Sequence, residues 1–501
     1  MGNVTGEGNI FDKQNSNTYF KGIHYFRHSS IQNSIPMKKF FTLLLLLFVF
    51  NSAFAQFAHQ NVNLLGIFDD PAVQPESVYG IRYQGCWGYA DSLGNEYGII
   101  GSTAGTYFVD ITDPTNPVQK TYIPHRQNDC IWHEYKSYEN YLYIISDDGG
   151  SPTNSLQIVD MKYLPDSIHM VYDDTTIFVH SHTQFVDGDR WYVASVTRKN
   201  GNFYPMAVYS LANPESPTLL RALNQDFPNI SSVHDMFVIH DTIFASCGYQ
   251  GLFIFKYDEQ NNQFIQLGAL PGNSNNYNHS SFISKDHSTL YLCEEVPAGQ
   301  PVQVIDITDI ANPSVLSTFV TNVGDTPHNP YVLGDFLYLA AYSDGVWVYD
   351  VSNPQTPVNT GYFDSHPQNG TSYPNAYEGA WGAYTDLPSG VLLGSDMQYG
   401  LFVLDKTIAV NVPHSSPASS SINVYPNPSM ADINVRMPGI RDESVAVTLI
   451  SMDGKVVYEN SSLAVANEKI TIPSTRIAAG LYTLKATTST NNFVKRINVL
   501  K

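Results

Sequence analysis

Short apolar runs alternate with polar turns along most of this chain. Runs such as LYIIS (142–146), WYVAS (191–195) and VLLGS (391–395) are rich in Tyr, Val, Ile and Leu. They are separated by clusters of Asp, Asn, Gly, Pro and Ser. Apolar stretches of this length between turn residues are typical of β-strands. The pattern therefore predicts an all-β protein.

One phrase recurs through the middle of the chain. Residues 105–117 have the sequence GTYFVDITDPTNP, residues 303–313 QVIDITDIANP and residues 345–357 GVWVYDVSNPQTP. Weaker copies begin at Leu156, Met206, Leu252 and Leu401, which makes seven. Each copy predicts a strand that ends in a turn, and an Asp at that point normally accepts hydrogen bonds from the turn backbone. We therefore interpret Asp110, Asp160, Asp306, Asp350 and Asp405 as structural.

A second marker precedes each copy of the phrase, at intervals of 45 to 53 residues. The markers are Trp87, His133, His182, His234, His279, His328 and Trp381. Each is followed by a second apolar run, and each phrase by a further short strand, so a unit holds four strands. Four-stranded units with this period are typical of propeller blades, which must stack to bury their faces. The sequence predicts a seven-bladed β-propeller over residues 56–405.

The last unit has three strands of its own before the chain leaves the repeats. Residues 62–68, near the expected mature N-terminus, resemble the fourth strand of another unit. We predict that this segment completes the seventh blade and leaves no open edge. Deletion of residues 56–70 should then lower the melting temperature sharply.

These repeat phrases resemble the LVIVD repeat, and their arrangement resembles the choice-of-anchor B family of exported proteins. The resemblance covers roughly Asn61 to Asp405. It implies a propeller fold and an extracellular location. It implies no agreed biochemical activity.

An export signal is predicted over residues 37–55. Lys38 and Lys39 precede an apolar run at 40–50, and Ala53-Phe54-Ala55 forms a small-x-small site, so cleavage is expected after Ala55. A buried helix or a membrane anchor is the alternative, but the run is short for a bilayer. Residues 1–36 are interpreted as an over-extended gene start. No later segment is apolar enough to cross a membrane.

The C-terminal part differs from the repeats. Residues 406–421 form a Ser/Pro-rich linker, and residues 422–501 predict a small Ig-like β-sandwich. Its motifs Tyr425-Pro426-Asn427-Pro428, Asp453-Gly454-Lys455 and Gly480-Leu481-Tyr482 resemble the type A sorting domain of the type IX secretion system. The resemblance implies that this machinery is a partner and that the protein reaches the outer-membrane surface or the extracellular space. An ordinary accessory sandwich is the alternative.

Charge excludes one class of partner. The chain carries a net charge of −20, with 26 Lys and Arg against 46 Asp and Glu. A surface of that sign repels a polyanion, so we expect no nucleic-acid binding.

The strongest candidate chemistry is the histidine series. Five histidines open equivalent strands of successive units: His133, His182, His234, His279 and His328. If these strands are innermost, the imidazoles surround one mouth of the channel, where converging His would hold copper, zinc or iron. Glu134 and Asp235 would orient or extend such a site, and Trp87 and Trp381 would form an aromatic wall. Repeats also copy residues for structural reasons, so strand capping by these histidines is the alternative.

Neither the cysteines nor any catalytic motif narrows the function further. Cys86 with Cys130, or Cys247 with Cys293, would form disulfides if they lie close enough, with the first pair favoured; four buried thiols are the alternative. No nucleophile elbow, P-loop or zinc-protease motif occurs. Two hypotheses follow: a surface binding protein with an unknown extracellular ligand, or a metal-dependent extracellular enzyme with its site at the channel mouth. The lack of catalytic motifs favours the first.

Overall fold

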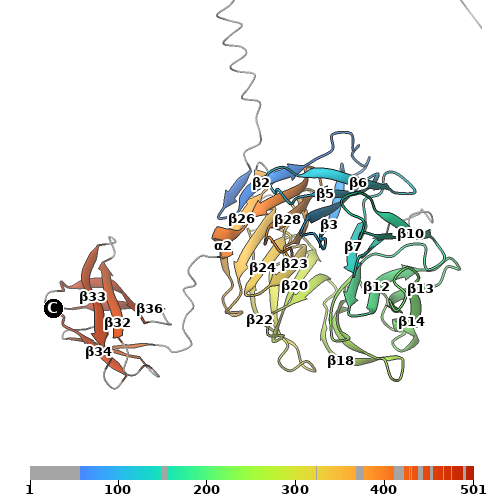
Figure 1. Cartoon of the computed structure of the whole chain (residues 1–501). Helices are drawn as coiled ribbons and strands as arrows, with labels where there is room; N and C mark the ends of the chain where they lie inside the picture. The colour runs from blue at the N-terminus through green and yellow to red at the C-terminus, as the bar shows by residue number, and fades with distance from the viewer. Residues whose placement is uncertain are drawn as a thin grey trace, which may run out of the picture. The chain divides into compact units, whose positions relative to one another are not determined.

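Figure 1 shows the computed structural model, which describes residues 57–410 with gaps at 148–154, 323 and 368–376, and most of residues 422–500. The gaps in the second part are residues 428, 430–431, 438–439, 441–443, 452–454, 466–467, 476 and 489–491. The predicted export signal at 37–55 and the segment 1–36 lie outside the described residues. So does most of the predicted linker.

Strands dominate both parts, as the sequence predicts. Within the described part of residues 57–410 they form seven antiparallel sheets, and five of these contain four strands that follow one another along the chain. The first two sheets are β3 (Tyr83–Ala90), β4 (Glu96–Ser102), β5 (Gly105–Asp110) and β6 (Val118–Pro124), then β7 (His133–Tyr138), β8 (Tyr141–Ser146), β9 (Leu156–Asp160) and β10 (His169–Asp174).

The next three sheets repeat this order. The third comprises β11 (Gln184–Asp187), β12 (Arg190–Thr197), β13 (Phe203–Ser210) and β14 (Thr218–Ala222). The fourth comprises β15 (Asp235–Ile239), β16 (Thr242–Ser246), β17 (Gly251–Asp258) and β18 (Gln263–Pro271). The fifth comprises β19 (Tyr277–Ile283), β20 (Thr289–Val296), β21 (Val302–Asp306) and β22 (Ser314–Phe319).

The last two sheets each include a strand from the start of the described chain. The sixth comprises β23 (Asn329–Leu333), β24 (Phe336–Ala340), β25 (Val346–Asp350), β26 (Val358–Asp364) and the added β1 (Ala58–Gln60). The seventh comprises β27 (Ala380–Tyr384), β28 (Leu392–Asp396), β29 (Gly400–Asp405) and β2 (Asn63–Phe68). The predicted closure is confirmed: β2 pairs antiparallel with β29, with Asn63 opposite Asp405 and Phe68 opposite Leu401. In Figure 1 the blue β2 accordingly lies among the orange strands.

The sheets stand around a central axis. The first strand of each sheet contacts the first strand of the next, in the order β3, β7, β11, β15, β19, β23 and β27, and β27 contacts β3. Every residue of β4 and β28 is buried, whereas most of β6 and β22 is exposed or half-buried. Burial of the middle strands and exposure of the last strand are what stacked, radial sheets require. The fold is therefore β-propeller-like, with the marker strands innermost.

The repeated aspartates cap the turns, as predicted. Asp110, Asp160, Asp306, Asp350 and Asp405 each accept a hydrogen bond from the backbone N–H two residues later, at 2.8 to 3.0 Å. Each bond satisfies a donor that the turn leaves unpaired. The short helices η1 (Leu223–Gln225) and α2 (Thr407–Val410) are too short to span a bilayer, and the described residues contain no helix that would.

The C-terminal part has its own core. Its described strands form a three-stranded sheet and a four-stranded sheet. They are β30 (Asn423–Tyr425), β31 (Ile433–Arg436) and β34 (Lys469–Ile472), then β33 (Val456–Ala464), β32 (Ser444–Ser451), β35 (Gly480–Thr487) and β36 (Asn492–Val499). Val435 and Ile470 from the first sheet and Val447, Leu484 and Ile497 from the second belong to one buried cluster. The two sheets therefore share one apolar interior.

Candidate functional site

A cavity of about 600 Å³ opens where the seven first strands meet. Its lining includes residues of all seven of these strands or of the residues just before them. The five marker histidines and Trp381 line it, as do Trp87, Glu134 and Asp235. All the residues that the sequence singled out for a site therefore border one cavity. Two carboxylates that the sequence analysis did not select, Asp147 and Glu295, line it too.

Four of the histidines form a continuous row, which we call the histidine row: His182, His234, His279 and His328. Neighbouring ring centroids lie 4.2, 4.4 and 4.5 Å apart along it. The row arises because each of its histidines lies within two residues of the start of an innermost strand, and adjacent sheets bring these positions side by side. Trp381 continues the row, with its ring centroid 4.6 Å from that of His328.

Each histidine of the row is held through Nδ1. His182 Nδ1 lies 2.8 Å from Asp147 Oδ2, and His234 Nδ1 lies 3.0 Å from the Tyr277 hydroxyl. His279 Nδ1 lies 3.1 Å from the carbonyl oxygen of His328, whose own Nδ1 lies 2.7 Å from the carbonyl oxygen of Trp381. Because a carbonyl only accepts, the Nδ1 atoms of His279 and His328 carry hydrogens. A neutral ring then keeps its lone pair on Nε2.

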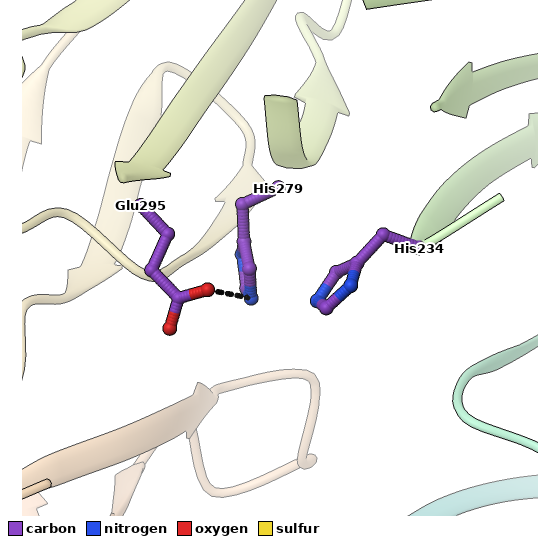
Figure 2. A group of neighbouring side chains, drawn as sticks. All are labelled: His234, His279 and Glu295. Carbon is purple, nitrogen blue, oxygen red and sulfur yellow. Dashed lines mark ion pairs between the residues drawn. The ribbon is translucent and has the colours of Figure 1, made fainter. Parts of the chain in front are cut away.

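The other ring nitrogens converge. His182 Nε2 and His234 Nε2 lie 3.0 Å apart, and His279 Nε2 lies 3.8 Å from Glu295 Oε2. His234, His279 and Glu295 each offer one ligand atom, and these three atoms lie within 4.8 Å of one another. Figure 2 shows the His279 ring between the Glu295 carboxylate and the His234 ring. Two imidazoles and one carboxylate are the ligand types of catalytic zinc sites.

Burial keeps most of the row uncharged. It lowers the pKa of His234, His279 and His328 below the ordinary value, although Glu295 partly offsets this for His279. Burial acts the same way on His182, but the hydrogen bond and charge of Asp147 outweigh it and raise the pKa of His182. Because only neutral imidazole binds a metal, the low pKa values favour ligation at neutral pH.

His133 is not part of the row. Its ring stacks on His125 at a centroid distance of 3.8 Å, and its Nδ1 lies 2.9 Å from Gln84 Oε1. Burial lowers the pKa of His133 to about 3. The residues that the structure brings together are therefore four of the five predicted histidines.

The carboxylates around the cavity differ in their partners. Glu134 accepts a hydrogen bond from Trp381 Nε1 at 3.1 Å, and Glu295 accepts one from the Tyr342 hydroxyl at 2.5 Å. Burial raises the pKa of Asp235 to about 6. Glu295 lies on β20 and Asp147 directly follows β8, so both come from the ends of second strands. An antiparallel hairpin places the end of its second strand beside the start of its first, and this pairing was the signal by which both could have been found.

Aromatic rings line the same cavity. The Trp381 ring centroid lies 5.2 Å from that of Trp132, which in turn lies 5.3 Å from that of Tyr377. Trp87 has a different set of partners: its ring packs on Tyr384 at 4.6 Å and its Nε1 donates to Ser137. The two tryptophans that occupy the marker position in the first and last units thus make separate contacts.

The favoured Cys86–Cys130 disulfide is wrong. The structure keeps Cys86, Cys130, Cys247 and Cys293 as thiols. The Cys130 thiol donates to the carbonyl oxygen of Gln127 at 2.9 Å, whereas Cys86 faces Ser395 of the seventh sheet. The two sulfur atoms are directed toward different neighbours, so adjacency of their units in sequence does not bring them together.

Comparison with solved structures gives distant matches. A putative 6-phosphogluconolactonase from Bacteroides uniformis is 14% identical, with a TM-score of 0.42, over 77% of this chain and 96% of that one. The periplasmic gluconolactonase PpgL of Pseudomonas aeruginosa is 14% identical, with a TM-score of 0.45, over 74% and 96%. At these values the likeness assigns no activity to this chain. No curated protein sequence matches it.

The C-terminal part has a clear family match. Residues 423–500 match the family described as the secretion system C-terminal sorting domain. This range contains Tyr425-Pro426-Asn427-Pro428 and Gly480-Leu481-Tyr482, the motifs from which the sequence predicted such a domain. Residues 423–500 are therefore a type IX sorting domain, which implies interaction with that secretion machinery and export to the cell surface or the extracellular space.

Proposed function

We propose that this protein is an exported binding protein whose central cavity holds a transition-metal ion on His234, His279 and Glu295. The observation that carries the proposal is the convergence of three ligand atoms within 4.8 Å. Each of the three side chains is also held by a hydrogen bond to Tyr277, to the His328 carbonyl oxygen or to Tyr342. Histidine ligands in metal sites almost always have their other nitrogen bonded in this way.

The ligand types favour a particular class of ion. Imidazole with one carboxylate suits zinc, iron or copper, whereas calcium and magnesium prefer oxygen alone. Ligand atoms around one zinc ion lie about 3–3.5 Å apart, given bond lengths of about 2.0–2.1 Å. Small rotations of these side chains would therefore bring the three atoms to bonding distance.

His182 supports the same site. Its Nε2 already lies 3.0 Å from that of His234, so the two rings are spaced as two ligands of one ion would be. Asp147 holds the far side of the His182 ring, which fixes its orientation. We therefore propose His182 as a fourth ligand or as the nearest neighbour of the ion.

The organisation of the chain supports a surface role. We propose a cleaved signal at 37–55, a seven-bladed propeller at 56–405 related to the choice-of-anchor B and LVIVD-repeat proteins, a linker at 406–421 and an Ig-like sorting domain at 422–501. The seven sheets with contacting first strands support the blade count. The ligand would enter the cavity, and the cavity volume of about 600 Å³ suits a small organic molecule.

A metal-dependent enzyme is the second candidate. Two histidines and one glutamate leave coordination positions open, as catalytic zinc and non-haem iron sites do. Turnover of ester, phosphoester or oxidisable substrates by the metal-loaded protein, abolished by His279→Ala, would favour this candidate. Stoichiometric binding without turnover would favour the first.

Metal binding to protein purified without a His-tag tests the proposal. After chelation and dialysis, calorimetric titration with Zn²⁺, Cu²⁺ and Fe²⁺ should show one tight site. His279→Ala should weaken metal binding at least about 100-fold, and Glu295→Gln should weaken it at least about 10-fold. His133→Gln, on the same cavity wall but outside the row, is the matched control and should change the affinity less than threefold. Absence of a saturable site, or equal loss in the control, would contradict the proposal.

A further inference from the structure

A second polar cluster lies outside the cavity lining, at one end of the sixth sheet. Thr321 and Asp325 lie in the segment between β22 and β23, Asp344 in the turn between β24 and β25, and Asp364 at the end of β26. Asp325 and Asp344 are each 4% exposed. Three separate segments of the chain thus bring carboxylates together, two of them buried and Asp364 half-buried.

One hydroxyl at the centre of the cluster faces two carboxylate acceptors. The Thr321 hydroxyl lies within hydrogen-bonding distance of both Asp325 Oδ2 and Asp344 Oδ2, the latter at 3.0 Å. A hydroxyl has a single hydrogen, so it donates to only one of the two carboxylates. The Thr321 hydroxyl therefore satisfies one of the two carboxylates, and Asn322 Nδ2 also donates to Asp344 Oδ2, at 2.8 Å.

Two oxygen atoms at this position have no partner. Asp325 Oδ1 and the hydroxyl oxygen of Thr326 are buried and make no hydrogen bond. Thr326 is only 3% exposed. Buried polar atoms are nearly always satisfied, so two neighbouring exceptions indicate a missing partner.

No positive charge compensates the cluster within the described residues. Burial raises the pKa of Asp325, Asp344 and Asp364, the last to about 6, and the mutual repulsion of the carboxylates contributes for Asp325 and Asp364. No Lys, Arg or His of the described chain forms an ion pair with any of the three. Buried charges of one sign require a counter-charge or a shared proton.

We propose that Asp325, Asp344 and Thr321 form a site for a hard divalent cation, with calcium favoured. All the ligand atoms are oxygens, the set that calcium prefers, and water would complete its six to eight ligands. The site is separate in chemistry from the nitrogen-rich cavity. Asp364 pairs with Ala58 of β1, so a bound cation would also stabilise the attachment of the N-terminal strand.

Calcium-dependent thermal stability tests this site. The protein would be purified as its host exports it and treated with a chelator. Its melting temperature would then be measured with and without 1 mM CaCl₂ or MgCl₂. A concentration about 100-fold above the dissociation constant should raise the melting temperature by roughly 3–5 °C for a domain of this size, with calcium more effective than magnesium. Asp344→Asn should abolish the rise. Asp306→Asn, which removes a half-buried turn-capping carboxylate from the fifth sheet, is the matched control and should keep the rise.

Three results would overturn the inference. They are no calcium-dependent rise in the unaltered protein, an equal rise in Asp344→Asn, and a calorimetric titration without a saturable calcium site. If Asp344→Asn fails to fold, the smaller change Thr321→Val should still weaken calcium binding at least fivefold, and unchanged affinity would contradict the site. A carboxyl pair that merely shares a proton would give no calcium effect. His279→Ala should keep the calcium response, which separates this inference from the proposed function.

Discussion

At the scale of single residues, the proposed metal binding depends on which ring nitrogen of each histidine already makes a hydrogen bond. Hydrogen bonds to Asp147, Tyr277 and two backbone carbonyls hold the Nδ1 atoms of the row. His182 Nε2 and His234 Nε2 lie 3.0 Å apart, so one of them carries the hydrogen of this bond and must release it before both can bind one ion. For His234 that release is a change of tautomer. The Tyr277 hydroxyl permits this change because it both donates and accepts.

Tyr342 positions the carboxylate ligand in this account. Its hydroxyl donates to Glu295 Oε1, and its ring centroid lies 4.4 Å from that of His328. Tyr342→Phe removes the hydrogen bond while keeping the ring, so we expect metal affinity to fall about tenfold. Calorimetric titration measures it. Tyr384→Phe, which also removes a hydroxyl from the cavity wall, should leave the affinity unchanged; equal effects in both variants would argue against positioning by Tyr342.

His133 should make stability sensitive to acid. Its pKa of about 3 lies below the unfolded value of about 6.5, so the unfolded chain binds the extra proton as the pH falls from 6.5. The stabilisation is present above pH 6.5 and is lost progressively toward pH 3. His133→Gln should reduce the pH slope of the free energy of unfolding by about 1.4 kcal/mol per pH unit between pH 6 and 4. Urea denaturation across this range measures the slope, and parallel curves for the two proteins would contradict the prediction.

Sequence reasoning identified the histidines because the repeat copies them at similar intervals of 45 to 53 residues. It did not select Asp147 and Glu295, because each occurs in one unit and lies outside the repeated phrases. Nor did the pitch reveal that His133 stacks on His125. Spacing along the chain predicts the strand position of a residue, but the direction and partners of its side chain depend on neighbours from other units.

At the scale of elements, the ring is closed by a strand from the opposite end of the repeats. Pairing of β2 with β29 follows from the missing fourth strand of the last unit, and the sequence was sufficient to predict it. The fifth strand on the sixth sheet was not predicted. β1 is three residues long and has no repeat equivalent, so no pattern marks its pairing with β26.

Deletion of residues 56–70 should cost much of the stability. It removes the partner of β29 and the buried side chains of Val62 and Phe68, which are 0% and 9% exposed. We expect the melting temperature to fall by about 10 °C or more, since each lost large side chain costs about 2–5 kcal/mol. Differential scanning calorimetry measures the fall. Deletion of residues 56–61 alone removes β1 but keeps β2 and should have a clearly smaller effect; an unchanged melting curve after the longer deletion would refute closure by β2.

At the scale of the whole molecule, two parts with separate cores have separate tasks. The sheets of residues 57–405 create the cavity, and the sorting domain at 423–500 directs export. The net charge of −20 still predicts that a polyanion such as nucleic acid is repelled. Motif order was enough to predict the sorting domain from sequence, because its turns carry distinctive residues.

Removal of residues 422–501 should block the last step of export. The truncated protein should accumulate in the periplasm and disappear from the surface and the medium, because the type IX machinery no longer recognises it. Cell fractionation with immunoblotting measures the distribution. Unaltered surface display of the truncated protein would show that residues 422–501 are not needed for export.

The most direct test of the central claim is anomalous X-ray diffraction from crystals of the metal-loaded protein, collected on both sides of the absorption edge of the bound metal. The account predicts one strong anomalous peak in the cavity, about 2.0–2.3 Å from a ring nitrogen of His234, from His279 Nε2 and from a Glu295 oxygen. A cavity without a peak, or a peak bound by His133 and His125 instead, would contradict it.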